Sequence, residues 1–276
     1  MSEIPTAGIR LNKYVSDSGQ CSRREADRWI DEGRITLNGQ PAELGAKVRP
    51  GDQVLLDGQP LTASEPLVYL LLNKPVGITC TTERDVDDNI IDYMDHPLRI
   101  FPVGRLDKMS EGLILLTNDG DIVNQILRAG NAHEKEYFVV VDQQVTADFV
   151  EGMKRGVPIL GTRTRPCRLF GVGEQSFRII LTEGLNRQIR RMCEYFGYRV
   201  RRLQRVRIMH LTLDGLPVGH WRELTAAELA TMRESLAGSV KTAPPELQRR
   251  RSGSAAQDTT GDKPQWRRPP RTDHGR

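Results

Sequence analysis

One short segment of the chain combines side chains that could do chemistry. Asp107 lies between Arg105 and Lys108 in the stretch GRLDKMSEGLILLTNDG, residues 104–120. A carboxylate that neighbouring cations keep ionised can act as a nucleophile or as a general base. The same arrangement on a surface loop can also be an ordinary salt bridge. The apolar residues 112–117 predict a strand directly after it, which would fix the carboxylate in place. The charges alone leave both interpretations open.

A second segment, residues 187–207, is rich in arginine. It holds eight arginines and one acidic residue, Glu194, interleaved with the aromatic residues Tyr195, Phe196 and Tyr198. From residue 241 to the end there are nine Lys and Arg against four Asp and Glu, which leaves 31 against 32 for residues 1–240. A basic stripe on a nearly neutral body favours binding of nucleic acid over a merely solvated surface.

The composition bounds the class of protein. The 276 residues are enough for one large domain or two ordinary ones. No apolar run approaches the ~20 residues that cross a bilayer, and the first residues do not resemble a signal peptide, so we expect a soluble, cytoplasmic protein. The four cysteines are widely spaced, which predicts free thiols and no zinc site. No glycine-rich cofactor loop follows a strand, which argues against a methyltransferase.

Residues 9–65 predict two short helices followed by small strands. Ser22 and Glu25 have the spacing of a capping box and predict a helix over residues 23–32. Asn38-Gly39, directly after a short strand at 35–37, indicates a hairpin, and residues 48–56 with the turn Pro50-Gly51-Asp52 predict another strand pair. On the second helix we expect three residues to face inward and three arginines to remain exposed: Ala26, Trp29 and Ile30, then Arg23, Arg24 and Arg28.

Residues 67–236 predict the main domain. Strands are expected at 67–72, 78–82, 112–117, 136–141, 177–181 and 206–213, and helices at 120–128, 147–155 and 186–196. Many strands and few helices predict an α+β fold built on a mixed, mostly antiparallel sheet. Residues 237–276 have almost no aliphatic side chains and abundant Pro, Arg, Gly and Ser, so we expect a disordered basic tail.

The run S-R-R-E-A-D-x-x-I-x-x-G-R-I-x-L-N-G, which begins at Ser22, resembles the S4 RNA-binding domain. The resemblance covers about residues 1–66. It implies that the helix pair presents basic side chains to folded RNA, with Arg23, Arg24 and Arg28 on that surface. A small structural cap without a ligand is the alternative.

Four blocks in order, LNKPVGITCT, GRLDKMSEGLILLTNDGD, HEKEYFVVV and TEGLNRQIRRMCEYFGY, closely resemble the pseudouridine synthases of the RsuA, RluB, RluE and RluF group. The details S-R-R-E-A-D, I-L-R-A-G-N-x-H-E-K-E-Y and G-V-P-I-L-G resemble the RluF subgroup, which acts on large-subunit (23S) ribosomal RNA. The resemblance implies an isomerisation without cofactor or metal. The N1–C1′ bond of a uridine breaks, the uracil turns, and C5 bonds to C1′. The base must leave its stack, because C1′ and C5 are shielded in a helix.

The resemblance also assigns roles. Asp107 is the catalytic carboxylate, Arg190 pairs with it, and Tyr137 stacks on the uracil. Leu203 packs against the base, and Arg105 helps to keep it extruded. The remaining residues that the resemblance places on the RNA path are Gly104, Leu106, Lys108, Asn186, Arg187, Gln188 and Ile189. The usual T-S-G-L after the aspartate block is here Ser110-Glu111-Gly112-Leu113, which adds a negative charge near the site.

Several alternatives stay open at this point. The target uridine is expected in 23S ribosomal RNA, with a transfer RNA anticodon stem-loop as a second possible substrate and small-subunit RNA as the runner-up. The chain is expected to be a monomer without an obligate protein partner. A non-catalytic S4-type protein of ribosome assembly is the alternative from another functional class.

Overall fold

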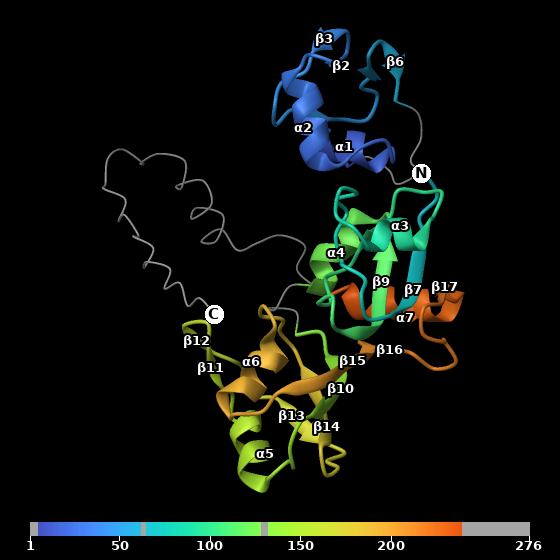
Figure 1. Cartoon of the computed structure of the whole chain (residues 1–276). Helices are drawn as coiled ribbons and strands as arrows, with labels where there is room; N and C mark the ends of the chain where they lie inside the picture. The colour runs from blue at the N-terminus through green and yellow to red at the C-terminus, as the bar shows by residue number, and fades with distance from the viewer. Residues whose placement is uncertain (1–4, 62–64, 128–131, 239–276) are drawn as a thin grey trace, which may run out of the picture. The chain divides into compact units, whose positions relative to one another are not determined.

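The structure is a computed structural model that describes residues 5–61, 65–127 and 132–238 (Figure 1). The expected tail over 237–276 lies almost wholly outside these residues. Within them, no helix is long and apolar enough to cross a membrane.

Residues 9–60 form a small α+β unit. Helices α1 (Leu11–Asp17) and α2 (Arg23–Asp31) pack against two small antiparallel sheets, β1-β4 and β3-β2-β5-β6. The strand bounds are β1 Ile9–Arg10, β2 Ile35–Leu37, β3 Gln40–Pro41, β4 Lys47–Val48, β5 Val54–Leu56 and β6 Gln59–Pro60. The core between these elements is apolar and contains Leu11, Val15, Ala26, Ile30, Ile35 and Val54.

The predicted capping box at the start of α2 is confirmed. The Ser22 hydroxyl accepts a hydrogen bond from the Glu25 amide at 3.1 Å, and the Glu25 carboxylate accepts one from the Ser22 amide at 3.5 Å. Ala26 and Ile30 are buried, whereas Trp29 is half-buried. The capped helix therefore carries Arg23, Arg24 and Arg28 on its exposed side, as expected.

The rest of the described chain is built on one mixed sheet in the order β13-β14-β10-β15-β9-β7-β17 (Figure 1). All neighbours on this path are antiparallel except β9 and β15, which are parallel at Gly112 and Arg205. Two short strands extend the sheet, β16 beside β15 and β8 beside β9, and β11 pairs with β12 separately. The strand bounds are β7 Tyr69–Lys74, β8 Phe101–Pro102, β9 Glu111–Thr117, β10 Lys135–Val141, β11 Pro158–Ile159, β12 Thr162–Arg163, β13 Arg168–Phe170, β14 Ser176–Leu181, β15 Val200–Ile208, β16 Leu211–Thr212 and β17 Trp221–Glu223.

Helices cover the sheet, and their bounds are α3 Ile90–Met94, α4 Gly120–Leu127, α5 Ala147–Lys154, α6 Gln188–Tyr195 and α7 Ala226–Leu236. The central residues of β7 and β9, 70–72 and 113–116, are all apolar because both faces of these strands are buried. One face packs against α4 and α7, and the other against α3. The half of the sheet that holds β10, β13, β14 and β15 packs against α5 and α6.

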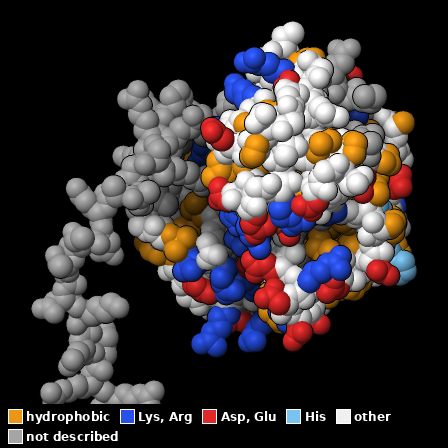
Figure 2. All heavy atoms as spheres, turned by 90° about the horizontal axis from the view of Figure 1, so that it is seen from above, with side chains coloured by type: hydrophobic (Ala, Val, Ile, Leu, Met, Phe, Trp, Pro, Cys, Tyr) orange, Lys and Arg blue, Asp and Glu red, His pale blue; other side chains and the backbone are white. Residues whose placement is uncertain are grey.

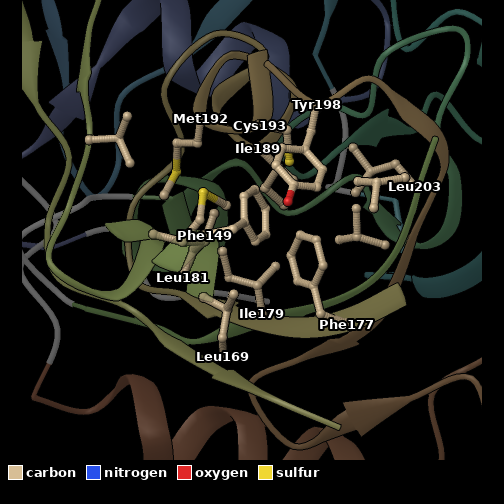
Figure 3. Packing of buried hydrophobic residues seen from close by; sticks show 14 of the residues in the cluster. Phe149, Leu169, Phe177, Ile179, Leu181, Ile189, Met192, Cys193, Tyr198 and Leu203 are labelled. Atoms are coloured by element: carbon tan, nitrogen blue, oxygen red, sulfur yellow. The ribbon is translucent and has the colours of Figure 1, made fainter. Parts of the chain in front are cut away.

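Three aromatic residues form the centre of this second core. Phe149 of α5 contacts Phe177 of β14 edge to face, with ring centroids 5.4 Å apart, and its centroid lies 4.2 Å from that of Tyr198 (Figure 3). The labelled residues Leu181, Ile189 and Leu203 also belong to this cluster. The core therefore ties α5 and α6 firmly to the strands beneath them.

The structure confirms the α+β class and the mixed, mostly antiparallel sheet, but it corrects two strands. Residues 78–82 do not form a strand; the backbone there makes one isolated bridge, between Thr79 and Asn89. The strand expected at 206–213 is the end of β15, then a turn in which Met209 takes a φ of +53°, then β16. Helices α3 and α7 and the short strands β8, β13 and β17 were not expected from the sequence.

Candidate active site

A cleft of about 530 Å³ opens where β10 and β15 meet the loops around residues 104–110 and 183–188. Most of the predicted site residues line it, namely Gly104, Arg105, Leu106, Asp107, Lys108, Tyr137, Asn186, Arg187, Gln188, Ile189 and Leu203. These segments are far apart in the sequence. The parallel pairing of β9 with β15 brings the Asp107 loop close to the strand that carries Leu203.

Arg190 lies behind the cleft and holds the Asp107 loop. Its Nε lies 3.7 Å from the Asp107 Oδ2, and the side chains are 10% and 31% exposed, respectively. The distance is that of an ion pair rather than a hydrogen bond, and within the described part of the chain Nε has no hydrogen-bond partner. Burial lowers the pKa of Arg190, and the Asp107 carboxylate opposes that shift. Arg190 therefore faces Asp107 as a buried charge on the side away from solvent.

The other nitrogens of Arg190 fix the backbone around Asp107. Nη2 donates to the Met109 carbonyl at 2.9 Å and lies 3.3 Å from the Ser110 hydroxyl, while Nη1 donates to the Val200 carbonyl at 3.2 Å. Arg190 thus joins helix α6, strand β15 and the loop of Asp107. The predicted pairing of Asp107 with Arg190 is present in this geometry.

Turns and a buried lysine support the same loop. The Ser110 amide donates to the Asp107 carbonyl at 2.9 Å, and the Gly77 amide donates to the Lys108 carbonyl at 2.8 Å. Lys74 is fully buried, and its ammonium donates to the carbonyls of Pro75 and Ile78, each at 2.8 Å. Burial lowers the pKa of Lys74. The lysine therefore organises the 74–78 turn against which the Asp107 loop rests.

One wall of the cleft is apolar. Tyr137 of β10 is half-buried and packs against both cores that meet at this strand. Leu203 of β15 is 7% exposed. A flat ring with an aliphatic neighbour at the edge of a packed core is suited to hold a planar base. The wall is rigid because Leu181, Ile189 and Leu203 are also core residues (Figure 3).

The rim of the cleft is polar, and its residues differ in their exposure and in whether they already form an ion pair. Arg105 and Asn186 are exposed. Arg187 is also exposed and is the N-cap of α6, with a φ of +50°. The helix expected over residues 186–196 thus begins only at Gln188, and Arg187 precedes it and does not share a helical face with Arg190. Lys108, expected at a phosphate, forms an ion pair with Asp88 at 3.1 Å.

Two of the residues expected on the RNA path are internal. Gln188 is 4% exposed, and its amide group already bridges the Leu185 amide at 3.0 Å and the Glu183 carboxylate at 2.9 Å. Ile189 is 4% exposed and packs in the core. Both residues shape the cleft wall from behind.

The arginine stripe of residues 187–207 is divided by the fold. Arg190 and Arg205 are buried, and Arg202 and Arg207 form ion pairs with acidic residues on neighbouring strands. Glu111, the departure from the family pattern, is the partner of Arg202 at 2.5 Å. Basic and acidic side chains also lie side by side on the face that Figure 2 shows, which views the molecule from the top of Figure 1. Fewer arginines of residues 187–207 are therefore available to bind RNA than the sequence suggests.

Sequence reasoning gave no role to two cations of the cleft wall, Lys135 and Arg205. The alternation of side chains along β10 could have revealed Lys135, because it is two residues from Tyr137 and shares its face. No group of three or more His, Cys, Asp and Glu that could hold a metal ion occurs among the described residues.

Family models match both parts of the chain. The model described as RNA pseudouridylate synthase matches residues 68–195, and the S4 domain model matches residues 9–54. The chain belongs to the RNA pseudouridine synthase family, and it is an isomerase of the type that carries an S4 domain.

Three named relatives illustrate the range of this family. The chain is 54% identical to the dual-specificity RNA pseudouridine synthase RluF of Escherichia coli strain K12, over 88% of this chain and 84% of the relative. It is 35% identical to ribosomal large subunit pseudouridine synthase B of Bacillus subtilis, over 81% and 95%. It is 32% identical to ribosomal small subunit pseudouridine synthase A of Yersinia pestis, over 81% and 98%.

A solved structure agrees with the fold. A crystal structure of a pseudouridylate synthase superposes with a TM-score of 0.60 at 28% identity, over 81% of this chain and 99% of the other. The resemblance that the four sequence blocks indicated is therefore confirmed at the level of family, fold and enzyme class.

Proposed function

We propose that the chain isomerises a specific uridine of large-subunit (23S) ribosomal RNA to pseudouridine, with Asp107 as the catalytic carboxylate. The observation that carries this proposal is the position of Asp107. It is one-third exposed in a cleft and has the buried Arg190 behind it at 3.7 Å. A carboxylate in this setting is open to a ligand on one side and is held by charge on the other.

The cleft fits the chemistry that the family performs. Its volume of about 530 Å³ lies in the range of ~300–1,000 Å³ that suits small ligands and single nucleotides. The target nucleotide would leave its stack and enter with the uracil against Tyr137 and Leu203. Asp107 would then face the ribose, where it either bonds to C1′ or removes the proton from C2′. Arg105 at the rim would occupy the space that the extruded base leaves.

The remaining residues hold the RNA strand. Asn186 and Arg187 are exposed at the rim, where a backbone phosphate would meet them. Lys108 would exchange its surface ion pair with Asp88 for a phosphate, an exchange of low cost because exposed ion pairs contribute about 0–1 kcal/mol. Arg23, Arg24 and Arg28 would add affinity through the first unit, which we place at about residues 1–66.

We infer a second substrate class, a transfer RNA anticodon stem-loop. The relatives at 54% identity bear the name dual-specificity RNA pseudouridine synthase, which supports two kinds of RNA target. We further propose that the chain acts as a monomer in the cytoplasm, where both RNA classes occur. Small-subunit RNA is the runner-up target, since a relative at 32% identity is named for the small ribosomal subunit.

The test compares RNA classes directly. The full chain is incubated with separate 23S, 16S and transfer RNA transcripts, and pseudouridine is mapped by carbodiimide labelling and reverse transcription. We expect a single modified site in the 23S transcript and one in an anticodon stem-loop. A site only in the 16S transcript would move the function to the small subunit. Tight binding without any modified site would favour the non-catalytic assembly protein.

A further inference from the structure

Two cations on the cleft wall have no part in the assignments above. Lys135 and Tyr137 are two residues apart on β10, so their side chains point to the same face of the sheet. Arg205 of β15 is the cross-strand partner of Tyr137. Lys135, Tyr137 and Arg205 all line the cleft that contains Asp107. The face against which the uracil would lie therefore carries two positive charges next to the aromatic ring.

The fold fixes Arg205 in this position. The residue is 3% exposed, and its Nε donates to the Leu113 carbonyl at 2.7 Å. Strands β9 and β15 approach closely at this point. A Cβ added to Gly112 would lie only 2.3 Å from the Arg205 carbonyl oxygen. The Nη2 atom of Arg205 is buried and has no hydrogen-bond partner among the described residues. The guanidinium is thus held rigidly and has an N–H donor, on Nη2, that remains available for a hydrogen bond.

Lys135 is held less tightly. Its ammonium donates to the His133 carbonyl at 3.2 Å, which leaves further donors available. In the described part of the chain, neither Lys135 nor Arg205 forms an ion pair with a carboxylate, since Asp107 pairs with Arg190 and Glu111 with Arg202. Burial, together with the charge of Arg205, lowers the pKa of Lys135 to about 8.

A buried cation, Arg205, beside a half-buried one, Lys135, with no carboxylate paired to either, is unfavourable in the free protein. An arrangement of this kind stabilises a negative charge that appears during a reaction, because the charged groups are already in position. The reaction of this family creates such a charge. This step of the reasoning rests on the proposed function, in which a uridine is detached and reattached.

When the N1–C1′ bond breaks, its electron pair remains on the uracil. C1′ either bonds to the Asp107 carboxylate or forms a double bond to C2′ as Asp107 takes the C2′ proton. The uracil anion carries its charge over N1 and the two carbonyl oxygens. C5 then attacks C1′. In the first route this breaks the bond from C1′ to Asp107 and frees the carboxylate; in the second, the C1′=C2′ double bond is consumed and Asp107 returns the proton to C2′. The C5 proton then leaves, and N1 gains a proton. A turn about the axis through N3 and C6 exchanges the carbonyl oxygens, so a fixed cation can serve the anion before and after the turn.

We propose that Lys135 and Arg205 stabilise the uracil anion while it is detached from the ribose. Lys135 donates to a uracil carbonyl oxygen, and Arg205 supplies a fixed positive charge beneath it. Lys135 and Arg205 thus act on the uracil, which is the leaving group, whereas Asp107 and its partner Arg190 act on the ribose.

The test compares two leaving groups. Single-turnover rates of the full chain and of Lys135→Met are measured on 23S transcripts that contain uridine or 5-fluorouridine, as the loss of the intact target nucleoside in chromatography with mass spectrometry. Fluorine at C5 cannot leave as a proton, so the C5-linked product of 5-fluorouridine keeps its fluorine and is followed as a separate species. Fluorine withdraws electrons and stabilises the uracil anion without help from the protein. We expect Lys135→Met to lose about 100-fold in rate with uridine, as for the loss of one charge-stabilising donor, and about tenfold or less with 5-fluorouridine. Lys135→Arg should recover most of the rate with uridine.

Matched variants separate this role from packing. Lys154→Met removes an exposed lysine of α5 that pairs with Glu151 at 3.0 Å, and it should leave both rates unchanged. Arg205→Lys keeps the positive charge but not the fixed position of the guanidinium. Its loss of rate should therefore also be smaller with 5-fluorouridine than with uridine. The dissociation constant for RNA should stay within about threefold for every variant, because the charge of the anion is absent from the bound substrate.

Three results would overturn the proposal. Equal losses of Lys135→Met on both transcripts would mean that the lysine only shapes the cleft. An unchanged rate with uridine would mean that its charge does not act on the leaving group. A wild-type chain that binds but converts neither transcript would overturn the proposed function itself, and this inference with it.

Discussion

Replacement of Arg190 by methionine should weaken both the fold and the chemistry, because this side chain joins three elements behind Asp107. Methionine has similar length and keeps the apolar packing of α6. The variant loses the hydrogen bonds to the carbonyls of Met109 and Val200, at 2.9 and 3.2 Å, and the ion pair with Asp107. The loss therefore tests whether one residue positions the carboxylate.

The magnitude follows from the geometry. Unit charges 3.7 Å apart attract by ~4.5 kcal/mol at an effective dielectric constant of about 20. Removal of a buried charge also relieves the unfavourable transfer of that charge out of water, which offsets much of this attraction. Two lost hydrogen bonds to a charged donor contribute about 1.5–3 kcal/mol each at most. We therefore expect a decrease of ~2–4 kcal/mol in the free energy of unfolding.

The effect on turnover should be larger than the effect on binding. A displacement of about 1 Å in a reacting group can lower a rate by ~10²-fold, and Asp107 loses both its backbone anchor and its counter-ion. Arg190→Lys keeps the charge but only part of the hydrogen bonding, so its rate should lie between that of the wild type and that of Arg190→Met. Urea unfolding and single-turnover kinetics on RNA at saturating enzyme measure the two effects.

A matched control is Arg178→Met, which removes an arginine of β14 that is 45% exposed and pairs with Glu136 at 2.8 Å. Its unfolding free energy should change by less than ~1 kcal/mol, and its rate should not change. The reasoning would be refuted if Arg190→Met unfolded at a lower urea concentration but turned over at the wild-type rate, because Arg190 would then be purely structural.

Three further changes have defined outcomes. Alanine at both Arg23 and Arg24 should weaken RNA binding and reduce the slope of log affinity against log salt by up to about 2, with an unchanged rate at saturating enzyme; an unchanged slope would exclude both arginines from the RNA surface. Gly112→Ala should lower the unfolding free energy by about 3 kcal/mol or more, because its φ is +104° and the new Cβ would meet backbone atoms of β15; a wild-type urea midpoint would contradict the close approach. Glu228→Gln should cost about 1 kcal/mol above pH 5, because Arg222 lowers the pKa of the partly exposed Glu228 to about 2. That difference should vanish in thermal melts as the pH falls from about 4.5 towards 2.

Local patterns in the sequence predicted local structure well. The capping box of Ser22 and Glu25 depends only on contacts within one helical turn, and it is present in the structure. Helix α7 begins with the same signal at Thr225 and Glu228, which the sequence analysis overlooked. Residues 78–82 alternate like a strand, but Lys74 binds the Ile78 carbonyl and the chain turns away after one bridge.

Local sequence patterns alone could not predict the contacts between distant segments. Asp107 and Arg190 are 83 positions apart, and their pairing was expected only from the family resemblance. The positions of Lys135 and Arg205 depend on how β10, β15 and β9 align, which a single sequence does not reveal. The arginine stripe likewise gave no indication that Glu111 would neutralise Arg202.

The most direct test of the central claim is tritium release from RNA labelled at C5 of uracil, measured with the wild-type chain and Asp107→Asn side by side. Asparagine keeps the size of the side chain and removes the carboxylate. We expect the wild type to release tritium from the 23S transcript, and Asp107→Asn to release none while its RNA affinity stays within several-fold. Release by the asparagine variant would contradict the assignment of Asp107 as the catalytic carboxylate.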